Sequence, residues 1–393
     1  MTLHRVHQPD GPQSSPSVQP LAGARPAVVY LPLPTTPPHE HQVHSALARR
    51  LAELLGYDWG GVHDAQRHAG RRLYAVPAAT LDDPAQVAAL GIRSEDDLFG
   101  GVVPQPFLAT KAISHDLVGP EAVAPPGWSP AFARRVAPVV LTGFTAFSRA
   151  DAWRAGLLLL RDGAVRFKPA CARGGRGQSV VDGEAALREA IDQLDDAEWR
   201  EGGAVLEENL TDVVTYSVGQ LRLPALLASY SGTQYLTPDN QGREVYGGSA
   251  LNVVGGDFES LMAQGLDDDA HRAVAHAWRY DQAVDECLAG VLASRRNYDV
   301  VIGRNARGEC RCGVLEQSWR IGGASGAEVA ALEVLAQGGA HAVSARVLER
   351  YGAKVAVPED ASVLYQDDDP QVGPVCKYVQ VRERYGECDG DAK

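Results

Sequence analysis

Apolar residues recur with two different periods in the first part of the chain. Residues 27–33 (AVVYLPL) form a β-rich apolar run, and residues 45–55 (SALARRLAELL) repeat apolar side chains at helical spacing. A second strand is expected at residues 73–76 and a short helix at residues 84–90. This alternation predicts a small α/β domain over residues 25–142.

The pattern becomes sharper beyond residue 142 and predicts an α+β core that extends to residue 330. A helix at residues 151–160, capped by Ser148, is followed by a strand at 164–169, a glycine-rich loop and a second strand. The further elements expected in this core are a helix at 184–194, strands at 204–208, 216–221 and 223–230, helices within 270–293, paired strands at 297–302 and 310–317, and a helix at 327–335. Residues 331–393 remain as a C-terminal extension and tail.

The first 24 residues are rich in Pro, Gln, Ser and Gly and contain no apolar core, which predicts a disordered leader and not a secretory signal. No run approaches the ~18 apolar residues that a membrane span needs. The 6 cysteines include no CxxC pair, so reduced thiols are expected, and Cys310 and Cys312 are expected to pack on one strand face. These features predict a cytoplasmic protein.

Acidic residues exceed basic ones: 50 Asp and Glu stand against 37 Lys and Arg, which gives a formal net charge of -13. The overall field therefore repels nucleic acid and anionic membrane surfaces, and neither is an expected partner. A nucleotide would have to bind at a local positive site. A lysine or arginine within a glycine-rich segment is the pattern that would provide one.

Residues 165–181 (VRFKPACARGGRGQSVV) contain such a pattern. Lys168 lies near the end of a predicted strand, and the glycine-rich loop at residues 173–178 can bring backbone amides close to phosphate oxygens. A Walker A loop is excluded because GK[ST] is absent, and a protein-kinase loop is excluded because its lysine follows the glycines. The alternative interpretation is a mobile hairpin with a surface lysine.

A predicted hairpin at residues 297–320 carries two acidic residues. Side chains alternate along a strand, so an even loop of two or four residues places Asp299 and Glu316 on one face as cross-strand neighbours. Two facing carboxylates suit a hard cation that bridges phosphates, and magnesium is the natural choice. The alternative is a salt bridge in which an arginine lies between the acids, with three candidates, Arg295, Arg296 and Arg320.

The order of these features resembles the ATP-grasp superfamily, the fold of carboxylate ligases and of biotin carboxylase. A strand lysine, a glycine-rich loop, a helix, an acidic EEN strand and a late acidic hairpin follow one another over residues 143–328. The resemblance implies an α/β (α+β) protein in which two α+β subdomains sandwich ATP, preceded by a small α/β domain. The chain also looks similar to an uncharacterised bacterial family of ATP-grasp-like proteins.

The resemblance assigns roles to individual positions. The loop lysine of the family corresponds to Lys168 and its substrate-facing arginine to Arg320, which are the expected catalytic residues. The metal acids correspond to Asp299 and Glu316, and Ser318 replaces an amide residue that normally completes the metal site. The expected nucleotide contacts are Lys111, Lys168, Gly174, Gly175, Arg176, Gly177, Glu207, Glu208, Asn209, Leu210 and Thr215, the last in place of a ribose-binding acid.

The expected cofactors are ATP and Mg2+, and the expected reaction joins a small-molecule or peptide carboxylate to an amine or thiol through an acyl phosphate. No protein nucleophile is required, in agreement with the absence of a GxSxG motif. One alternative is a biotin-carboxylase-like enzyme that acts on a separate carrier, because Met1 and Met262 are the only methionines and no Met-Lys-Met attachment site exists. The other is an ATP-binding protein without ligase turnover, which Ser318 and Thr215 favour.

Two further features carry weaker predictions. His39, His41 and His44 can gather a metal, but a solvated helix start is the expected interpretation. Residues 246–249 (YGGS) form either a polar glycine loop that can contact substrate or an ordinary turn.

Overall fold

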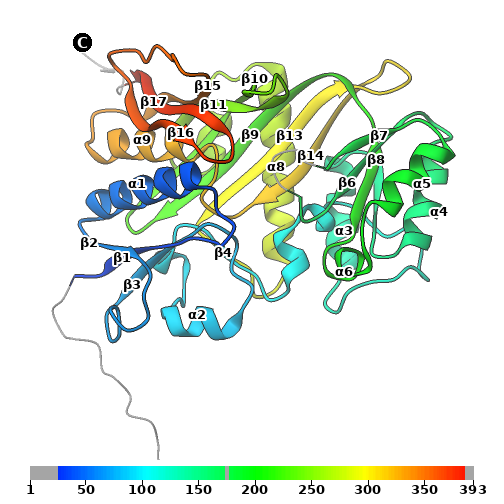
Figure 1. Ribbon diagram of the computed structural model, residues 1–393, viewed down its shortest axis with the longest axis horizontal. Coiled ribbons are helices and arrows are strands. Elements are labelled where there is room, and N and C mark those ends of the chain that lie inside the picture. The colour runs from blue at the N-terminus through cyan, green and yellow to red at the C-terminus, as the bar shows by residue number, and fades with distance from the viewer. Residues whose placement is uncertain (1–24, 173–176, 386–393) are drawn as a thin grey trace, which may run out of the picture.

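The computed structural model describes residues 25–172 and 177–385. The predicted leader, residues 1–24, lies outside them. A three-stranded, a four-stranded and an eight-stranded sheet organise the described residues (Figure 1), and a small ladder of β4 (Gly101–Val102) and β12 (Leu292–Ala293) links the first sheet to the third. The mixed α/β architecture is the one that the sequence predicts.

The N-terminal unit is a parallel sheet in the order β2-β1-β3, formed by Asp58–Val62, Ala27–Leu31 and Leu73–Pro77. Every residue of β1 and β3 is buried, which explains why both appear in the sequence as continuous apolar runs. Helix α1 (Pro38–Leu55) packs its apolar face on this sheet, and α2 (Pro84–Leu90) follows β3. The sequence pattern misses β2, because its segment DWGGV contains two glycines.

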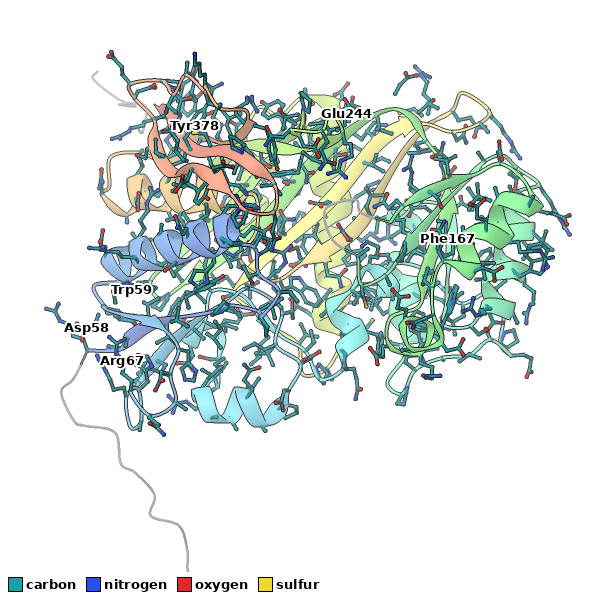
Figure 2. The ribbon with its side chains drawn as sticks, viewed as in Figure 1. Asp58, Trp59, Arg67, Phe167, Glu244 and Tyr378 are labelled. Atoms are coloured by element: carbon teal, nitrogen blue, oxygen red, sulfur yellow. The ribbon has the colours of Figure 1, made fainter. Side chains whose placement is uncertain are left out.

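A second unit is built on an antiparallel sheet in the order β5-β8-β6-β7. Phe167, labelled in Figure 2, lies in its hydrophobic core with Leu187 and Trp199. This unit therefore has a core of its own. Its elements are β5 (Gly143–Ala146), α4 (Arg149–Leu159), β6 (Val165–Pro169), β7 (Ser179–Val181), α5 (Glu184–Asp192), α6 (Asp196–Glu201) and β8 (Ala204–Glu208).

The largest sheet is antiparallel and has the order β14-β13-β9-β10-β11-β15-β17-β16. Helix α8 (Asp268–Cys287) packs on β13 and β14, whereas α9 (Ser325–Ala336) lies beside α1 and shares its core (Figure 1). The strands are β9 (Thr211–Leu223), β10 (Leu226–Pro238), β11 (Glu244–Gly255), β13 (Arg295–Arg304), β14 (Cys310–Ser318), β15 (Ala342–Tyr351), β16 (Ser362–Asp369) and β17 (Gly373–Tyr385).

The remaining described helical elements are short. They are the helices α3 (Pro130–Val136) and α7 (Phe258–Met262) and the 3-10 turns η1 (Glu95–Asp97), η2 (Pro106–Ala109), η3 (Lys111–Ser114) and η4 (Ala137–Val139). The turns η2 and η3 lead from the N-terminal unit towards the four-stranded sheet. No helix within the described ranges is both long and apolar enough to cross a membrane.

The segment after residue 330 continues the largest sheet. Strand β15 pairs with β11, and β17 pairs with β15. The boundary expected at residue 330 therefore cuts through one sheet, because the strands of the expected extension complete its hydrogen bonding.

Residues 246–249 lie in strand β11, so the expectation of a loop or turn is wrong. Gly248 has a φ of +133°, and a Cβ at this position would lie 2.1 Å from the carbonyl oxygen of Val347. The close approach of β15 therefore requires glycine here. The glycines of the YGGS segment thus mark strand packing in this sheet.

Helix α1 begins at Pro38, so His39, His41 and His44 lie inside it. His39 and His44 are buried, and burial lowers the pKa of both. The backbone N–H of His39 donates to Oδ2 of Asp369 at 3.0 Å, and Nδ1 of His44 lies 3.3 Å from the hydroxyl of Tyr30. The expected solvated helix start is wrong, because this end of α1 packs between β1 and β16.

Cys287, Cys310, Cys312 and Cys376 are free thiols. Cys310 is exposed, and its sulfur accepts a hydrogen bond from Arg272 at 3.4 Å, whereas Cys312 is half-buried against α8. The expectation that both pack on one apolar strand face is therefore wrong for Cys310, which lies at the exposed start of β14.

Candidate functional site

Asp299 on β13 and Glu316 on β14 lie directly opposite each other, which confirms the predicted cross-strand pair. The pairing does not arise from an even-length loop, as the sequence analysis expected. The connecting loop has an odd number of residues, 305–309, and an unbroken register would place Leu315 opposite Asp299. A shift of register between Asp299 and Val300 makes Leu315 an extra residue and brings Glu316 into place.

The carboxylate of Asp299 is held by neutral groups. Its Oδ1 accepts hydrogen bonds from Nε2 of Gln234 at 2.8 Å and from Nδ2 of Asn297 at 3.1 Å. Burial, followed by the nearby charge of Glu316, raises the pKa of Asp299 to about 6. Among the described residues the negative charge at this position is therefore incompletely balanced, and the position fits a bound cation.

Lys111, the first residue of η3, is the basic partner of Glu316. Its Nζ lies 3.0 Å from Oε2 of Glu316, and the lysine side chain is only 5% exposed. The same Nζ donates to the carbonyl oxygens of Ala172 at 2.6 Å and Ala170 at 3.5 Å. Lys111 therefore connects the acidic pair to the segment that enters the glycine-rich loop.

Arg295 does not separate the two acids. It forms a buried ion pair with Glu328 at 2.6 Å. Its Nη1 donates to the carbonyl oxygen of Ser318 at 3.0 Å and to the Ser318 hydroxyl at 3.3 Å. The salt-bridge alternative is therefore wrong for Arg295. Ser318, which stands where the resemblance expects an amide residue, has the Arg295 guanidinium as its neighbour.

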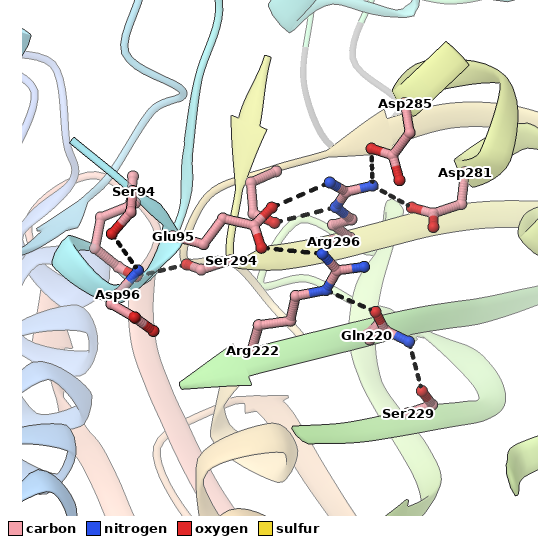
Figure 3. A network of polar contacts seen from close by, with 12 residues as sticks. Ser94, Glu95, Asp96, Gln220, Arg222, Ser229, Asp281, Asp285, Ser294 and Arg296 are labelled. Carbon is pink, nitrogen blue, oxygen red and sulfur yellow. Dashed lines mark hydrogen bonds and ion pairs between the residues drawn. The ribbon is translucent and has the colours of Figure 1, made fainter. Parts of the chain in front are cut away.

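Arg296 is also engaged elsewhere, at the centre of the network in Figure 3. Its guanidinium pairs with Glu95 at 3.1 Å, Asp281 at 3.0 Å and Asp285 at 2.8 Å. Glu95 also pairs with Arg222 on β9 at 3.0 Å. This network joins the N-terminal unit to α8 and the largest sheet, so the salt-bridge alternative is wrong for Arg296 as well.

Lys168 is buried on β6 and forms an ion pair with Oε1 of Glu207 on β8. Nε2 of His115 lies 3.1 Å from the other carboxylate oxygen of Glu207, Oε2. Burial raises the pKa of Glu207, but the charge of Lys168 and the contact with His115 outweigh that effect and hold the pKa at about 2. The predicted phosphate lysine and the predicted strand acid are therefore partners within the protein, and the surface-lysine alternative is wrong.

Sequence reasoning misses His115. It follows Lys111 in the segment ATKAISH, but a single histidine without a ligand pattern gives no signal. The contact arises because Leu117 bridges to Thr145 on β5, which brings the histidine to the four-stranded sheet. A Cβ on Gly143 would lie 3.0 Å from Cε1 of His115, so the glycine at the start of β5 leaves room for the ring.

A cavity of about 510 Å³ lies at the acidic pair. The ends of β1 and β3 contribute Leu31 and Pro77 to its wall, and residues 170–172 contribute from the four-stranded unit. All three sheets therefore meet at one cavity. The predicted site residues that line it are Lys111, Asp299, Glu316, Ser318 and Arg320.

The strand residues predicted to contact the nucleotide lie outside this lining. Oε1 of Glu208 accepts hydrogen bonds from the N–H of Thr142 and from Nε of Arg311, both at 3.0 Å. Oδ1 of Asn209 accepts from Arg166 at 2.8 Å. Glu208 is the last residue of β8, and its contact with Arg311 links this end of the strand to β14.

The remaining predicted nucleotide contacts are Leu210, Thr215 and four residues of the glycine-rich loop. Leu210 is buried against Leu141 and Val301, and Thr215 on β9 pairs with Val301 on β13. Gly177 has a φ of +67°, a conformation that favours glycine. Gly174, Gly175 and Arg176 lie outside the described residues.

The donor set suits a magnesium ion that has further oxygen ligands from outside the protein. Within the described ranges, no group of three or more His, Cys, Asp or Glu side chains could hold a metal ion. Asp299 and Glu316 offer two hard carboxylate ligands, so the remaining ligands must be other oxygens, such as water or phosphate. The arrangement therefore fits a cation that arrives with an anionic ligand better than a cation bound alone.

The family described as "Protein of unknown function (DUF3182)" matches residues 29–379. The chain belongs to this family. A search of curated proteins gave no match.

Solved structures identify the fold. A biotin carboxylase from Campylobacter jejuni, solved as a β-γ-ATP complex, has 12% identity and a TM-score of 0.54, over 91% of this chain and 88% of that chain. An N5-carboxyaminoimidazole synthetase from Staphylococcus aureus, complexed with ADP, has 11% identity and a TM-score of 0.56, over 92% of this chain and 94% of that chain. Both are ATP-grasp proteins, and the DUF3182 chain has the ATP-grasp fold.

Proposed function

We propose that the protein is an ATP- and magnesium-dependent carboxylate ligase. The observation that carries this proposal is the facing pair of Asp299 and Glu316, with Lys111 bound to Glu316, on the wall of a cavity in an ATP-grasp fold. Two carboxylates beside a lysine suit a nucleotide that brings its own cation. The complexes of the two similar structures with ADP and with an ATP derivative support a nucleotide as the ligand.

Each candidate residue has a defined role in this proposal. Asp299 and Glu316 would hold Mg2+, which would supply positive charge to the phosphate oxygens. Lys111 and Lys168 neutralise further phosphate charge, and the ion pair with Glu207 fixes the position of Lys168. The proposed contacts to the rest of the nucleotide are Gly174, Gly175, Arg176, Gly177, Glu207, Glu208, Asn209, Leu210 and Thr215.

The proposed reaction has two steps. A carboxylate oxygen of the substrate attacks the γ-phosphorus of ATP, and the bond from that phosphorus to the β,γ-bridging oxygen breaks, which gives an acyl phosphate and ADP. An amine or thiol then attacks the carbonyl carbon, loses its proton and displaces phosphate. Arg320 lines the cavity and is proposed to bind and orient the substrate carboxylate.

A nucleotide-binding protein without ligase turnover is the second candidate. The contact between Arg295 and the Ser318 hydroxyl favours it, because a guanidinium at 3.3 Å disfavours a metal ion on the same oxygen. The two candidates differ in turnover and not in nucleotide binding.

Capture of the acyl phosphate tests the proposal. The protein is incubated with ATP, Mg2+, hydroxylamine and fractionated cell metabolites, and hydroxamates are identified by mass together with the ADP formed. Glu316→Gln is the matched control, because it removes one carboxylate charge at nearly constant volume. Hydroxamate that requires ATP and disappears in the control supports the ligase. ATP binding without hydroxamate in any fraction supports the second candidate.

A further inference from the structure

Gln317 follows Glu316 on β14 and has no role in the function proposed above. The residue is 5% exposed. Its Nε2 donates hydrogen bonds to the carbonyl oxygen of Leu108 at 2.8 Å and to that of Thr110 at 2.7 Å. Thr110 directly precedes Lys111, so Gln317 holds the backbone immediately before the lysine of the site.

The partners of Gln317 fix the orientation of its amide. Backbone carbonyls can only accept hydrogen bonds, so the side chain must direct its NH2 group at both of them. Its Oε1 is buried and has no hydrogen-bond partner in the described part of the chain. A buried acceptor without a partner destabilises a fold, so packing alone does not explain a glutamine at this position. An apolar residue could not supply the two hydrogen bonds to the carbonyl oxygens of Leu108 and Thr110.

Neighbouring residues of β14 hold the same segment at other points. Oε2 of Glu316 lies 3.0 Å from Nζ of Lys111. The hydroxyl of Ser114 donates to the carbonyl oxygen of Leu315 at 3.4 Å. Successive residues of β14 therefore contact the segment before, at and after Lys111, and Gln317 provides the contacts before it.

We propose that Gln317 is a positioning residue for Lys111. By fixing the backbone at Leu108 and Thr110, it directs the ammonium group of Lys111 towards Glu316 and the root of the glycine-rich loop. The effect on ligand binding rests on the proposed contact of Lys111 with the nucleotide. Without the hydrogen bonds from Gln317, Lys111 would lose conformational freedom only when the nucleotide binds. The entropy lost at that step lowers the affinity.

The first measurement needs no nucleotide. Amide hydrogen exchange of residues 106–114 is compared in the wild type, in Gln317→Leu and in the control Gln220→Leu. Gln220 is a matched control, because it is 3% exposed in the same sheet and its Nε2 donates to the hydroxyl of Ser229 at 3.2 Å, in the network of Figure 3. Gln317→Leu is expected to accelerate exchange of this segment about tenfold, as loss of a buried hydrogen bond predicts. Unchanged exchange, or equal acceleration in the control, overturns the proposal.

The second measurement is ATP affinity by calorimetry. Gln317→Leu is expected to weaken binding about tenfold, and Gln220→Leu is expected to leave it unchanged. In a double-mutant cycle, Lys111→Met with Gln317→Leu is expected to bind ATP no more weakly than Lys111→Met alone, because a positioning residue acts through the residue that it positions. Additive losses contradict the positioning role. A wild type that does not bind ATP refutes the proposed function and leaves the exchange result as the test of positioning.

Discussion

The ammonium group of Lys111 and the carboxylate of Glu316 lie 3.0 Å apart, with side chains that are 5% and 29% exposed. The buried lysine therefore has a carboxylate partner before any ligand binds. Within the described residues, the hydrogen-bond donors to Oδ1 of Asp299, directly opposite Glu316, are the amides of Gln234 and Asn297. These residues therefore neutralise only half of the charge of the acidic pair, which leaves the other half for a cation.

Glu316→Gln is expected to abolish the magnesium-dependent rise in melting temperature that ATP produces, while the protein stays folded. The substitution removes a ligand charge with little change in volume. Relief of repulsion with Asp299, worth ~0.2 to 1 kcal/mol for a cross-strand pair, offsets part of the loss of the Lys111 contact. Thermal melts with and without Mg2+ and ATP measure both effects.

Glu328→Gln is the control for this melt. Glu328 and Arg295 form a fully buried pair, so removal of its charge is expected to cost ~3 to 5 kcal/mol. If Glu316→Gln destabilises the ligand-free protein as strongly as Glu328→Gln does, Glu316 serves a structural salt bridge and the metal-site proposal is refuted.

Lys168→Ala is expected to reduce both stability and ATP affinity. Lys168 and Glu207 are both buried, so the substitution leaves a buried carboxylate with His115 as its remaining partner, at a cost of ~3 to 5 kcal/mol. The double variant Lys168→Met with Glu207→Gln removes both charges and is expected to recover most of that stability. Denaturant unfolding and calorimetry measure the two properties. A double variant that regains ATP affinity together with stability would exclude Lys168 as a phosphate ligand.

The raised pKa of Asp299 predicts opposite pH dependences for folding and for cation binding. Because the pKa rises from 3.8 in the unfolded chain to about 6 in the folded one, ionisation opposes folding. The contribution of Asp299 to stability is therefore full below about pH 4 and is lost as the pH rises through about 6. Magnesium-dependent ATP binding is expected to increase over the same interval, because the ionised carboxylate binds the cation.

Asp299→Asn provides the comparison for this pH dependence. The variant is expected to lose the increase in ATP binding near pH 6, because its side chain does not titrate. Titrations of wild type and variant at several pH values, with Mg2+ present, give the difference directly. An identical pH profile in both proteins would assign the titration to another group.

The sequence predicts those features of this protein that depend on a local pattern of residues. Alternation along the late hairpin predicts that Asp299 and Glu316 lie on one face, and they do. The loop is one residue longer than an even loop, and the register shift between Asp299 and Val300 restores the pairing. No sequence pattern indicates either feature. Lys111 and Glu316 are found separately, but their contact depends on the tertiary path of η3.

Other features depend on contacts between distant segments. His115 becomes part of the Lys168 site only because its segment bridges to β5. The glycines of residues 246–249 indicate a turn until the closeness of β15 is known. The polar histidines of α1 suggest solvent exposure, whereas β1 and β16 bury His39 and His44. In each case, packing between segments that are distant in the sequence determines the structure, and local composition does not predict it.

Ser318→Ala is expected to change the affinity for Mg2+ in the presence of ATP by less than about threefold, a difference below ~1 kcal/mol. The hydroxyl of Ser318 already accepts a hydrogen bond from Arg295 at 3.3 Å, so a metal ion on that oxygen would face a nearby positive charge. Mn2+ is a convenient probe, because its electron paramagnetic resonance signal falls when the ion binds, and Glu316→Gln serves as the variant expected to lose binding. A loss of Mn2+ affinity in Ser318→Ala as large as that in Glu316→Gln would make Ser318 a metal ligand. It would also show that Arg295 moves away from the hydroxyl when the nucleotide and its cation bind.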